Sequence, residues 1–123
     1  MALNILIVDD STAIRKILIR VLRQTGLVIG EVFEARDGLE ALEIVKNHPL
    51  NLVLSDINMP NMDGLSLLAE LKASETWRNL PVVMITTEGS EEKVGQAIRL
   101  GSAAYIRKPF TAEQIQEKIS AIL

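Results

Sequence analysis

The chain alternates short apolar runs with longer stretches in which apolar residues recur at helical spacing. The short runs are rich in Ile, Val and Leu, as buried strands are, and they cover residues 4–8, 32–35, 52–55, 82–86 and 104–106. Strict alternation of strands and helices predicts a parallel sheet with helices on both faces, and right-handed crossovers leave few topologies for it. No linker, repeat or low-complexity tract interrupts the pattern. The sequence therefore predicts one compact α/β domain over residues 1–123.

Five stretches with helical periodicity lie between and after these runs. Their apolar positions are Ile14, Ile17, Leu18, Val21 and Leu22, then Leu39, Leu42 and Val45, then Leu65, Leu68 and Leu71, then Val94, Ile98 and Leu100, and finally Ile115, Ile119 and Leu123. Gly26 and Gly101 stand where the first and fourth helices should end. Thr111 with Gln114 has the pattern of a capping box at the start of the fifth helix.

The composition excludes several classes of protein. A chain of 123 residues with 48% hydrophobic and 24% charged residues is ordinary for a soluble globular protein. The absence of cysteine excludes disulfides, thiolate nucleophiles and sulfur-ligated metals. A net charge of −3 argues against nucleic-acid binding, and no apolar stretch approaches membrane-spanning length. Because the chain starts directly on a strand with no visible secretory signal, we expect a cytoplasmic protein.

Charged side chains follow three of the predicted strands. Asp9 and Asp10 come directly after the first strand, and Asp56 follows the third. Arg107 and Lys108 follow the fifth. In an open parallel sheet, ligands bind beyond the carboxyl ends of the strands, which form one edge. We therefore expect three carboxylates and an ammonium group to meet there, as a site for a hard cation with its own counter-charge.

The adjacent pair Asp9 and Asp10 has two interpretations. One carboxylate could simply be a favourable charge near a helix N-terminus. Capping does not explain two adjacent carboxylates, because like charges this close repel and raise each other's pKa. A divalent cation would relieve the repulsion. Mg²⁺ suits such a site, since it binds one or two carboxylates and keeps several waters.

Asp56 ends a buried run and begins a shaped loop that contains Pro60 and the pair Asp63 and Gly64. A role as a helix N-cap is weakened because the next helix starts several residues later. An exposed carboxylate beside a metal can act as a nucleophile toward phosphorus and form an aspartyl phosphate. The metal would neutralise the oxygens of the incoming phosphoryl group.

Two other positions at this edge have a structural and a chemical interpretation. Thr86 is an ordinary strand former, but from the carboxyl edge its hydroxyl could donate a hydrogen bond to a phosphoryl oxygen. Lys108 is held extended by Pro109, and the peptide between them can be cis. Lysine is usually a solvated surface charge. Arg107 competes for the role of counter-charge, and strand alternation leaves open which of the two points at the carboxylates.

The order and spacing of these motifs resemble those of bacterial response-regulator receiver domains. The matching features are Asp9 with Asp10, the run Asp-Ile-Asn-Met-Pro-Asn-Met-Asp-Gly that begins at Asp56, Thr86, and Lys108-Pro109-Phe110. The resemblance spans the chain, and within the family it is to the stand-alone chemotaxis regulators of the CheY type. It implies a flavodoxin-like three-layer α/β/α sandwich with five helices and a five-stranded parallel sheet of order 2-1-3-4-5.

The resemblance also assigns roles to residues of the site. Asp56 would accept a phosphoryl group from a phosphohistidine on a sensor kinase. Asp10, the Asp56 carboxylate and the backbone carbonyl of Asn58 would bind Mg²⁺, with Asp9 assisting through water. Lys108 would pair with the phosphorylated carboxylate, which selects it over the neighbouring arginine.

A two-state switch follows from the same resemblance. Thr86 would hydrogen-bond the phosphoryl group and move toward it, and Tyr105 would swing from outside to inside. The surface made by the fourth helix, fifth strand and fifth helix would change as a result. Spacing alone predicts only packing for Tyr105. That surface carries both charge signs, from Glu88, Glu91, Glu92, Lys93, Arg107 and Lys118, so no partner charge is implied.

Three functions compete on the sequence. A signalling switch would modify itself, by self-catalysed phosphotransfer and autodephosphorylation, without being an enzyme on outside substrates. An aspartyl-nucleophile phosphohydrolase needs a substrate cap and a second general acid, which the short connections do not suggest. A degenerate receiver that only docks is disfavoured by the intact acidic pair and Lys108. Nucleotide binding has no support, since no Walker-type loop or dinucleotide fingerprint is present.

The resemblance implies a monomer that exchanges its phosphoryl group with a sensor histidine kinase. A flagellar motor switch protein or a phosphatase would be a further partner. Nucleic acid and membrane are not expected partners. A phosphorelay intermediate, or a receiver cut from a larger regulator, is the alternative to a chemotaxis protein.

Overall fold

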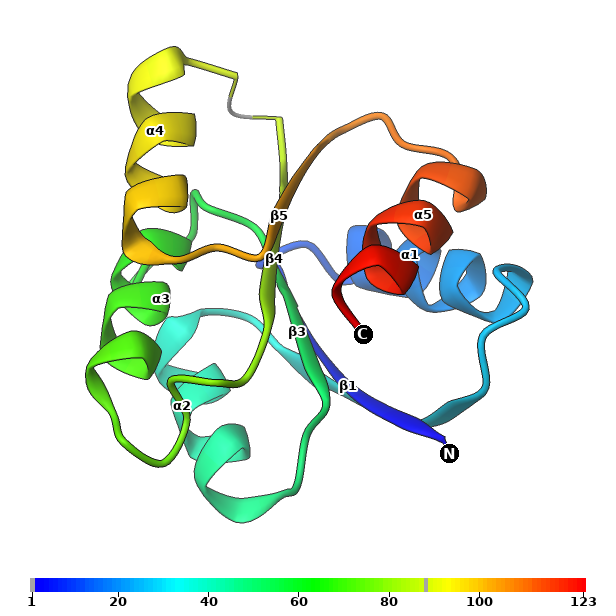
Figure 1. The fold of residues 1–123 in the computed structure, drawn as a ribbon, viewed down its shortest axis with the longest axis horizontal. Helices are drawn as coiled ribbons and strands as arrows, with labels where there is room; N and C mark the ends of the chain where they lie inside the picture. The colour runs from blue at the N-terminus through cyan, green and yellow to red at the C-terminus, as the bar shows by residue number, and fades with distance from the viewer. Residues whose placement is uncertain (1, 88) are drawn as a thin grey trace.

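In the computed structural model, which describes residues 2–87 and 89–123, five parallel strands form a sheet whose two faces are covered by helices (Figure 1). The strands are β1 Leu3–Val8, β2 Ile29–Ala35, β3 Leu52–Ser55, β4 Val82–Thr86 and β5 Ala104–Arg107. The helices are α1 Thr12–Gln24, α2 Gly38–Asn47, α3 Gly64–Ala73, α4 Glu91–Leu100 and α5 Ala112–Ile122. The strand order β2-β1-β3-β4-β5 confirms the flavodoxin-like fold. Glu88, expected at the opening of the fourth helix, lies outside the described residues.

The sheet separates two apolar layers, because successive strand residues point to opposite faces. Ile5 and Ile7 of β1 belong to the layer shared with α1 and α5. Leu6 and Val8 belong to the layer shared with α2, α3 and α4. Figure 1 shows these two groups of helices on opposite sides of the sheet. Every residue of β3 and β4 is buried, so the ends of these central strands are held firmly in place.

Side-chain caps fix where the helices begin. Ser11, Asp37 and Asp63 each accept a hydrogen bond from a backbone N–H in the first turn of α1, α2 and α3, respectively. The predicted capping box of Thr111 and Gln114 is confirmed at the start of α5. None of the described helices has both the length and the apolar character needed to cross a bilayer.

The chain path agrees with the predicted helix ends and differs at one strand. Gly26 and Gly101 have φ angles of 82° and 99°, the left-handed conformation expected just past a helix. β2 begins at Ile29 and not at residue 32, where its apolar run starts. Gly30 and Glu31 are poor strand formers, and β2 is an edge strand that is only partly buried. The apolar run therefore marked only the second half of this strand.

Four apolar residues that helical periodicity placed on inner faces are exposed instead. Ile17, Leu39, Ile98 and Leu123 are 42%, 51%, 63% and 55% exposed. In α2 the first turn packs through Gly38, and a Cβ at this glycine would meet the side chain of Met62. This close approach puts Gly38, Ala41 and Val45 on the buried face and turns Leu39 outward. Periodicity located the helices correctly and was wrong about these four positions.

Candidate functional site

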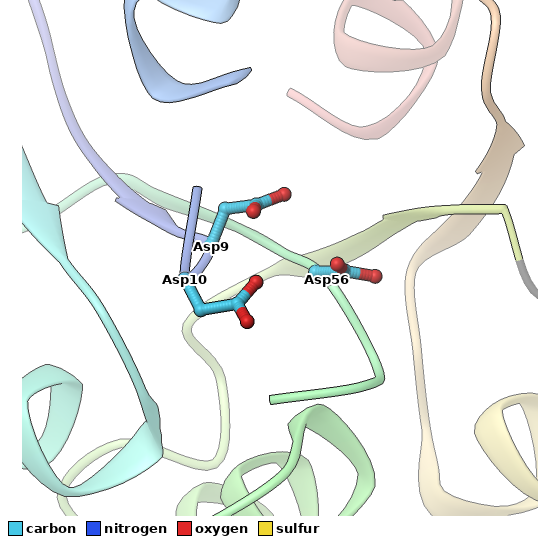
Figure 2. Close-up of side chains that lie close together, drawn as sticks. All are labelled: Asp9, Asp10 and Asp56. Carbon is cyan, nitrogen blue, oxygen red and sulfur yellow. The ribbon is translucent and has the colours of Figure 1, made fainter. Parts of the chain in front are cut away.

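The carboxyl ends of β1 and β3 bring three aspartates together. Because β1 pairs directly with β3, Asp9 and Asp10 lie beside Asp56, whose backbone N–H donates to the carbonyl of Val8 at 2.9 Å. One carboxylate oxygen from each aspartate lies within 4.8 Å of the others. Figure 2 shows the three side chains projecting into the same space beyond the strand ends. The predicted convergence of carboxylates at this edge is therefore a feature of the structure.

Asp9 is the buried member of the cluster, with 2% of its surface exposed. Its Oδ1 atom accepts a hydrogen bond from the backbone N–H of Ser11 at 2.9 Å. Its Oδ2 atom pairs with the Nζ atom of Lys108 at 2.8 Å. Both oxygens of the Asp9 carboxylate are thus engaged by the protein itself.

Asp10 and Asp56 are more open. The Asp56 side chain is 12% exposed, and its Oδ1 atom accepts a hydrogen bond from the N–H of Ile57 at 2.7 Å. Asp10 is exposed, and no hydrogen bond to its carboxylate is found within residues 2–87 and 89–123. These two carboxylates therefore have oxygens available to a ligand.

Lys108, and not Arg107, reaches the carboxylates. Its Nζ atom lies 2.8 Å from Asp9 and 3.5 Å from Asp56. Its backbone N–H donates to the carbonyl of Thr86 at 3.0 Å, and the peptide to the following proline is cis. Arg107 is exposed, and its guanidinium lies against Gly89, where a Cβ would be 2.7 Å from it. The structure thus selects between the two cations that strand alternation left open.

The other predicted site residues lie at or near the same edge. Thr86 is fully buried as the last residue of β4. Tyr105 lies in β5, opposite Met84, and packs against the apolar layer of α2, α3 and α4. Asn58 is exposed in the loop between β3 and α3, two positions after Asp56. These placements are compatible with the expected roles, which stay predictions.

The loop after Asp56 is held at both ends, and the contact of Asn61 with Asp37 was not predicted from the sequence. A Cβ at Gly64 would meet the backbone carbonyl of Asp56, so the start of α3 lies tightly against the end of β3. On the other side, the side chain of Asn61 donates to Asp37 at 2.8 Å. The N–H of Glu40 and then the Asn61 amide lower the pKa of Asp37. An Asp before a Gly and an apolar helix is an N-cap signal, but it does not reveal this second contact.

The donor set of the cluster fits a hard divalent cation. It consists of carboxylate oxygens alone, without imidazole or sulfur, and such ligands suit Mg²⁺ or Ca²⁺. The exposed Asp10 leaves room for the water ligands that Mg²⁺ retains. The residues present can therefore hold a magnesium ion.

Comparison with known proteins decides the family. A profile of the response regulator receiver domain matches residues 5–120. The chain belongs to this receiver family. Chemotaxis protein CheY-3 of Vibrio cholerae serotype O1 is 42% identical to it over 120 residues, which cover 98% of this chain and 91% of that protein. The chemotaxis protein CheY homolog of Campylobacter jejuni is 36% identical over 122 residues, with coverage of 98% and 92%.

Solved receiver structures share the fold of this receiver. Chemotaxis response regulator CheY4 of Vibrio cholerae is 31% identical with a TM-score of 0.87, and the match covers 100% of both chains. The receiver domain of a signal transduction histidine kinase from Syntrophus aciditrophicus is 30% identical, also with a TM-score of 0.87, and the match covers 99% and 90% of the two chains. The likeness to CheY-type receivers, predicted from the motifs, is confirmed. Receivers of this family bind Mg²⁺ at an acidic pocket, as the aspartate cluster here suggests.

We predict opposite effects on stability for two substitutions in the acidic pair when no metal is bound. Asp10→Asn should raise the free energy of unfolding, because it removes one of three mutually repelling carboxylates and no hydrogen bond found in the described residues. Asp9→Asn should lower it by about 1–3 kcal/mol, because it leaves the Lys108 ammonium short of its partner at a buried site. Urea unfolding in EDTA measures both. Equal losses in the two variants would contradict this account of the cluster.

Proposed function

We propose that this receiver is a phosphoryl-accepting switch, in which Asp56 takes a phosphoryl group from a sensor histidine kinase. The observation that carries the proposal is the position of the Asp56 carboxylate, which is partly open to solvent and 3.5 Å from the Lys108 ammonium. A carboxylate oxygen would attack the phosphorus of the donor's phosphohistidine. The phosphorus–nitrogen bond would break as the new phosphorus–oxygen bond forms, and its electron pair would return to the imidazole.

Asp10, the Asp56 carboxylate and the carbonyl of Asn58 would hold Mg²⁺. When bound, the ion supplies positive charge that offsets repulsion between these carboxylates and the incoming phosphoryl oxygens. The availability of oxygens on Asp10 and Asp56 supports this assignment. Asp9 would assist only through water, which fits the engagement of both its oxygens by a backbone N–H and a lysine.

Lys108 and Thr86 would receive the phosphoryl oxygens and start the switch. Lys108 would move from its shared position between two aspartates to the phosphorylated one. Thr86 would donate its hydroxyl hydrogen to the phosphoryl group and shift toward it. Because β4 pairs with β5, this shift would reach Tyr105 and change the surface formed by α4, β5 and α5.

An apolar groove supports the docking of a protein phosphodonor. The groove has a volume of about 360 Å³ and lies between α1 and the segment that joins β5 to α5. It is lined by Ile14, Ile17, Val21, Thr87, Lys108, Pro109 and Phe110. Lys108 contributes to both the groove and the aspartate cluster, so a kinase seated there would bring its phosphohistidine beside Asp56. This position also accounts for the unexpected exposure of Ile17.

The chemotaxis proteins among the relatives support a role in chemotaxis, with a flagellar motor switch protein or a phosphatase as a further partner. The likeness to a receiver domain of a histidine kinase supports the alternative, a phosphorelay receiver or part of a larger regulator. We place the exchange in the cytoplasm, with residues 1–123 acting as one monomeric receiver domain. The receiver would modify itself and release its own phosphate, and would not turn over an outside substrate.

We predict that acetyl phosphate with Mg²⁺ adds one phosphoryl group to the wild-type receiver and none to Asp56→Asn, because the amide is a poor nucleophile. Intact-mass spectrometry measures the product. Asp63→Asn is the matched control, since asparagine still caps α3 and leaves Asp56 unchanged. Failure of the wild type to be modified, or equal modification of Asp56→Asn, would refute the proposed acceptor.

The groove assignment predicts that Ile17→Glu slows transfer from a phosphorylated histidine kinase by about tenfold or more, because the interface would desolvate a charge. Transfer from acetyl phosphate should stay unchanged, since this small donor does not need the groove. Ile98→Glu, the same change at an exposed isoleucine of α4, is the control and should leave kinase transfer intact. The assignment fails if both variants behave alike with the kinase.

For the switch, we predict that Thr86→Ala is still phosphorylated at Asp56 but responds less at β5. The alanine lacks the hydroxyl that would follow the phosphoryl group. The measurement is the change in the backbone amide shift of Tyr105 on phosphorylation, recorded by NMR. Thr87→Ala is the control, since this neighbouring threonine is exposed beyond the strand. An undiminished Tyr105 response in Thr86→Ala would contradict the proposed transmission from Thr86 to Tyr105.

A further inference from the structure

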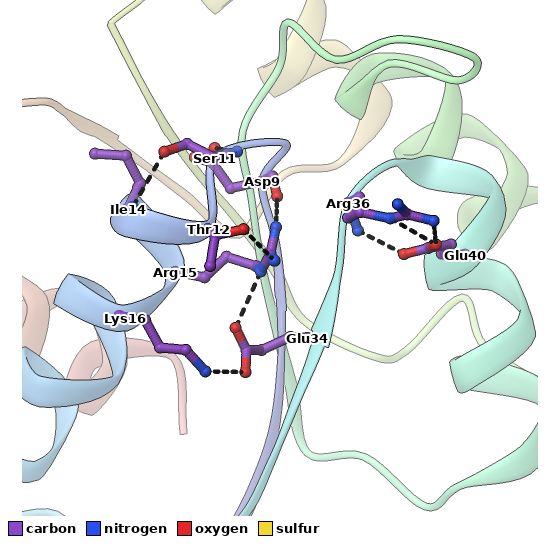
Figure 3. Close-up of polar contacts among 9 residues, drawn as sticks. All are labelled: Asp9, Ser11, Thr12, Ile14, Arg15, Lys16, Glu34, Arg36 and Glu40. Atoms are coloured by element: carbon purple, nitrogen blue, oxygen red, sulfur yellow. Dashed lines mark hydrogen bonds and ion pairs between the residues drawn. The ribbon is translucent and has the colours of Figure 1, made fainter.

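We propose that Arg15 is a positioning residue for the acidic pair and so for metal binding. Arg15 is 7% exposed, and its guanidinium contacts the backbone of Asp9, the residue before Asp10 (Figure 3). The inference rests on the proposed Mg²⁺ site and adds a residue that would not touch the ion.

Arg15 connects three separate parts of the fold. Its Nη1 group donates to the backbone carbonyl of Asp9 at 2.6 Å. Its Nη2 group donates to the hydroxyl of Thr12 at 3.1 Å, and its Nε group donates to Glu34 at 3.0 Å. The first contact is at the end of β1, the second in the first turn of α1 and the third on β2. One buried side chain thus ties the turn between β1 and α1 to the sheet.

The contact with the Asp9 carbonyl fixes the backbone that presents Asp10. The carbonyl of Asp9 and the N–H of Asp10 belong to one planar peptide group, so holding the oxygen orients the whole plane. The Asp9 side chain has its own anchors in Ser11 and Lys108. Asp10 is exposed and has no such anchor in the described residues, so its direction depends on the backbone. Arg15 therefore controls the ligand that is otherwise least constrained.

Glu34 keeps the guanidinium in place. Its second carboxylate oxygen pairs with Lys16 at 2.9 Å, as Figure 3 shows. The hydrogen bond from Lys16 lowers the pKa of Glu34, and the hydrogen bond from Arg15 lowers it by a smaller amount. Glu34 thus stays ionised at neutral pH, and the buried cation Arg15 has a partner on β2.

An arginine suits this position better than a lysine. Its rigid planar group offers donors in several fixed directions, whereas an ammonium is a compact charge on a flexible stem. Groups that orient metal ligands without touching the metal typically change metal affinity by about 10–100-fold when they are replaced. Arg15→Lys keeps the positive charge and removes the planar set of donors. It therefore separates the contribution of the charge from that of the directed hydrogen bonds.

The test compares wild type, Arg15→Lys and Lys16→Met. Lys16→Met removes the other cation on Glu34 but keeps the bond to the Asp9 carbonyl, so it is the matched control. Calorimetry measures Mg²⁺ affinity, urea unfolding in EDTA measures stability, and the NMR order parameter of the Asp10 amide measures how freely its peptide plane moves. We expect Arg15→Lys to weaken Mg²⁺ binding about tenfold or more and to lower the order parameter at Asp10, and Lys16→Met to change affinity less than about twofold.

A purely structural role would give a different result. Arg15→Lys would then be less stable yet bind Mg²⁺ within about twofold of wild type, and the inference would be overturned. Glu34→Gln is a second variant, in case Arg15→Lys does not fold, and it should weaken Mg²⁺ binding by loosening Arg15 from β2. A wild-type receiver that binds no Mg²⁺ would defeat the proposed function itself, and the inference with it.

Discussion

Repulsion among three carboxylates gathered at one edge of the sheet is the constraint on which this receiver depends. Asp9, Asp10 and Asp56 place oxygens within 4.8 Å of one another, and among the described residues the ammonium of Lys108 is the cation that pairs with these carboxylates. The fold tolerates this concentration of charge because the strands beneath it are buried on both faces. The same excess of negative charge makes the edge receptive to a cation and, through the cation, to a phosphoryl group.

The three aspartates of the cluster differ in how tightly the protein holds them, because different elements contact each one. Asp9 is buried and engaged through its carbonyl and both carboxylate oxygens. Asp56 is held by the backbone at the end of β3 but keeps an oxygen turned toward Lys108. Asp10 is exposed. This gradient from fixed to open fits the three roles proposed for residues of one type: an anchor for the lysine, an acceptor, and a metal ligand.

Much of this arrangement could be predicted from the sequence. Alternating apolar runs predicted the parallel sheet, and polar residues after those runs predicted the carboxylate cluster. Spacing could not choose between Arg107 and Lys108, because both come directly after the apolar run of the strand. In the structure Arg107 is the last residue of β5, and Lys108, just beyond it, is bonded through its N–H to the Thr86 carbonyl. The contacts of Arg15 with Glu34 and of Asn61 with Asp37 were missed for a related reason. They join side chains 19 and 24 positions apart, and local periodicity carries no information about such pairs.

The backbone hydrogen bond between Lys108 and the carbonyl of Thr86 has a consequence for how a signal is encoded. The two residues that would contact the phosphoryl oxygens lie at the ends of the neighbouring strands β4 and β5, and their backbones are bonded to each other at that point. They are therefore parts of one body, and a half-response in which one side chain reports the phosphoryl group while the other does not is disfavoured. Each receiver molecule would then be in one of two states, unswitched or switched. The strength of a stimulus would set the fraction of molecules that are switched, and not how far any one molecule has moved.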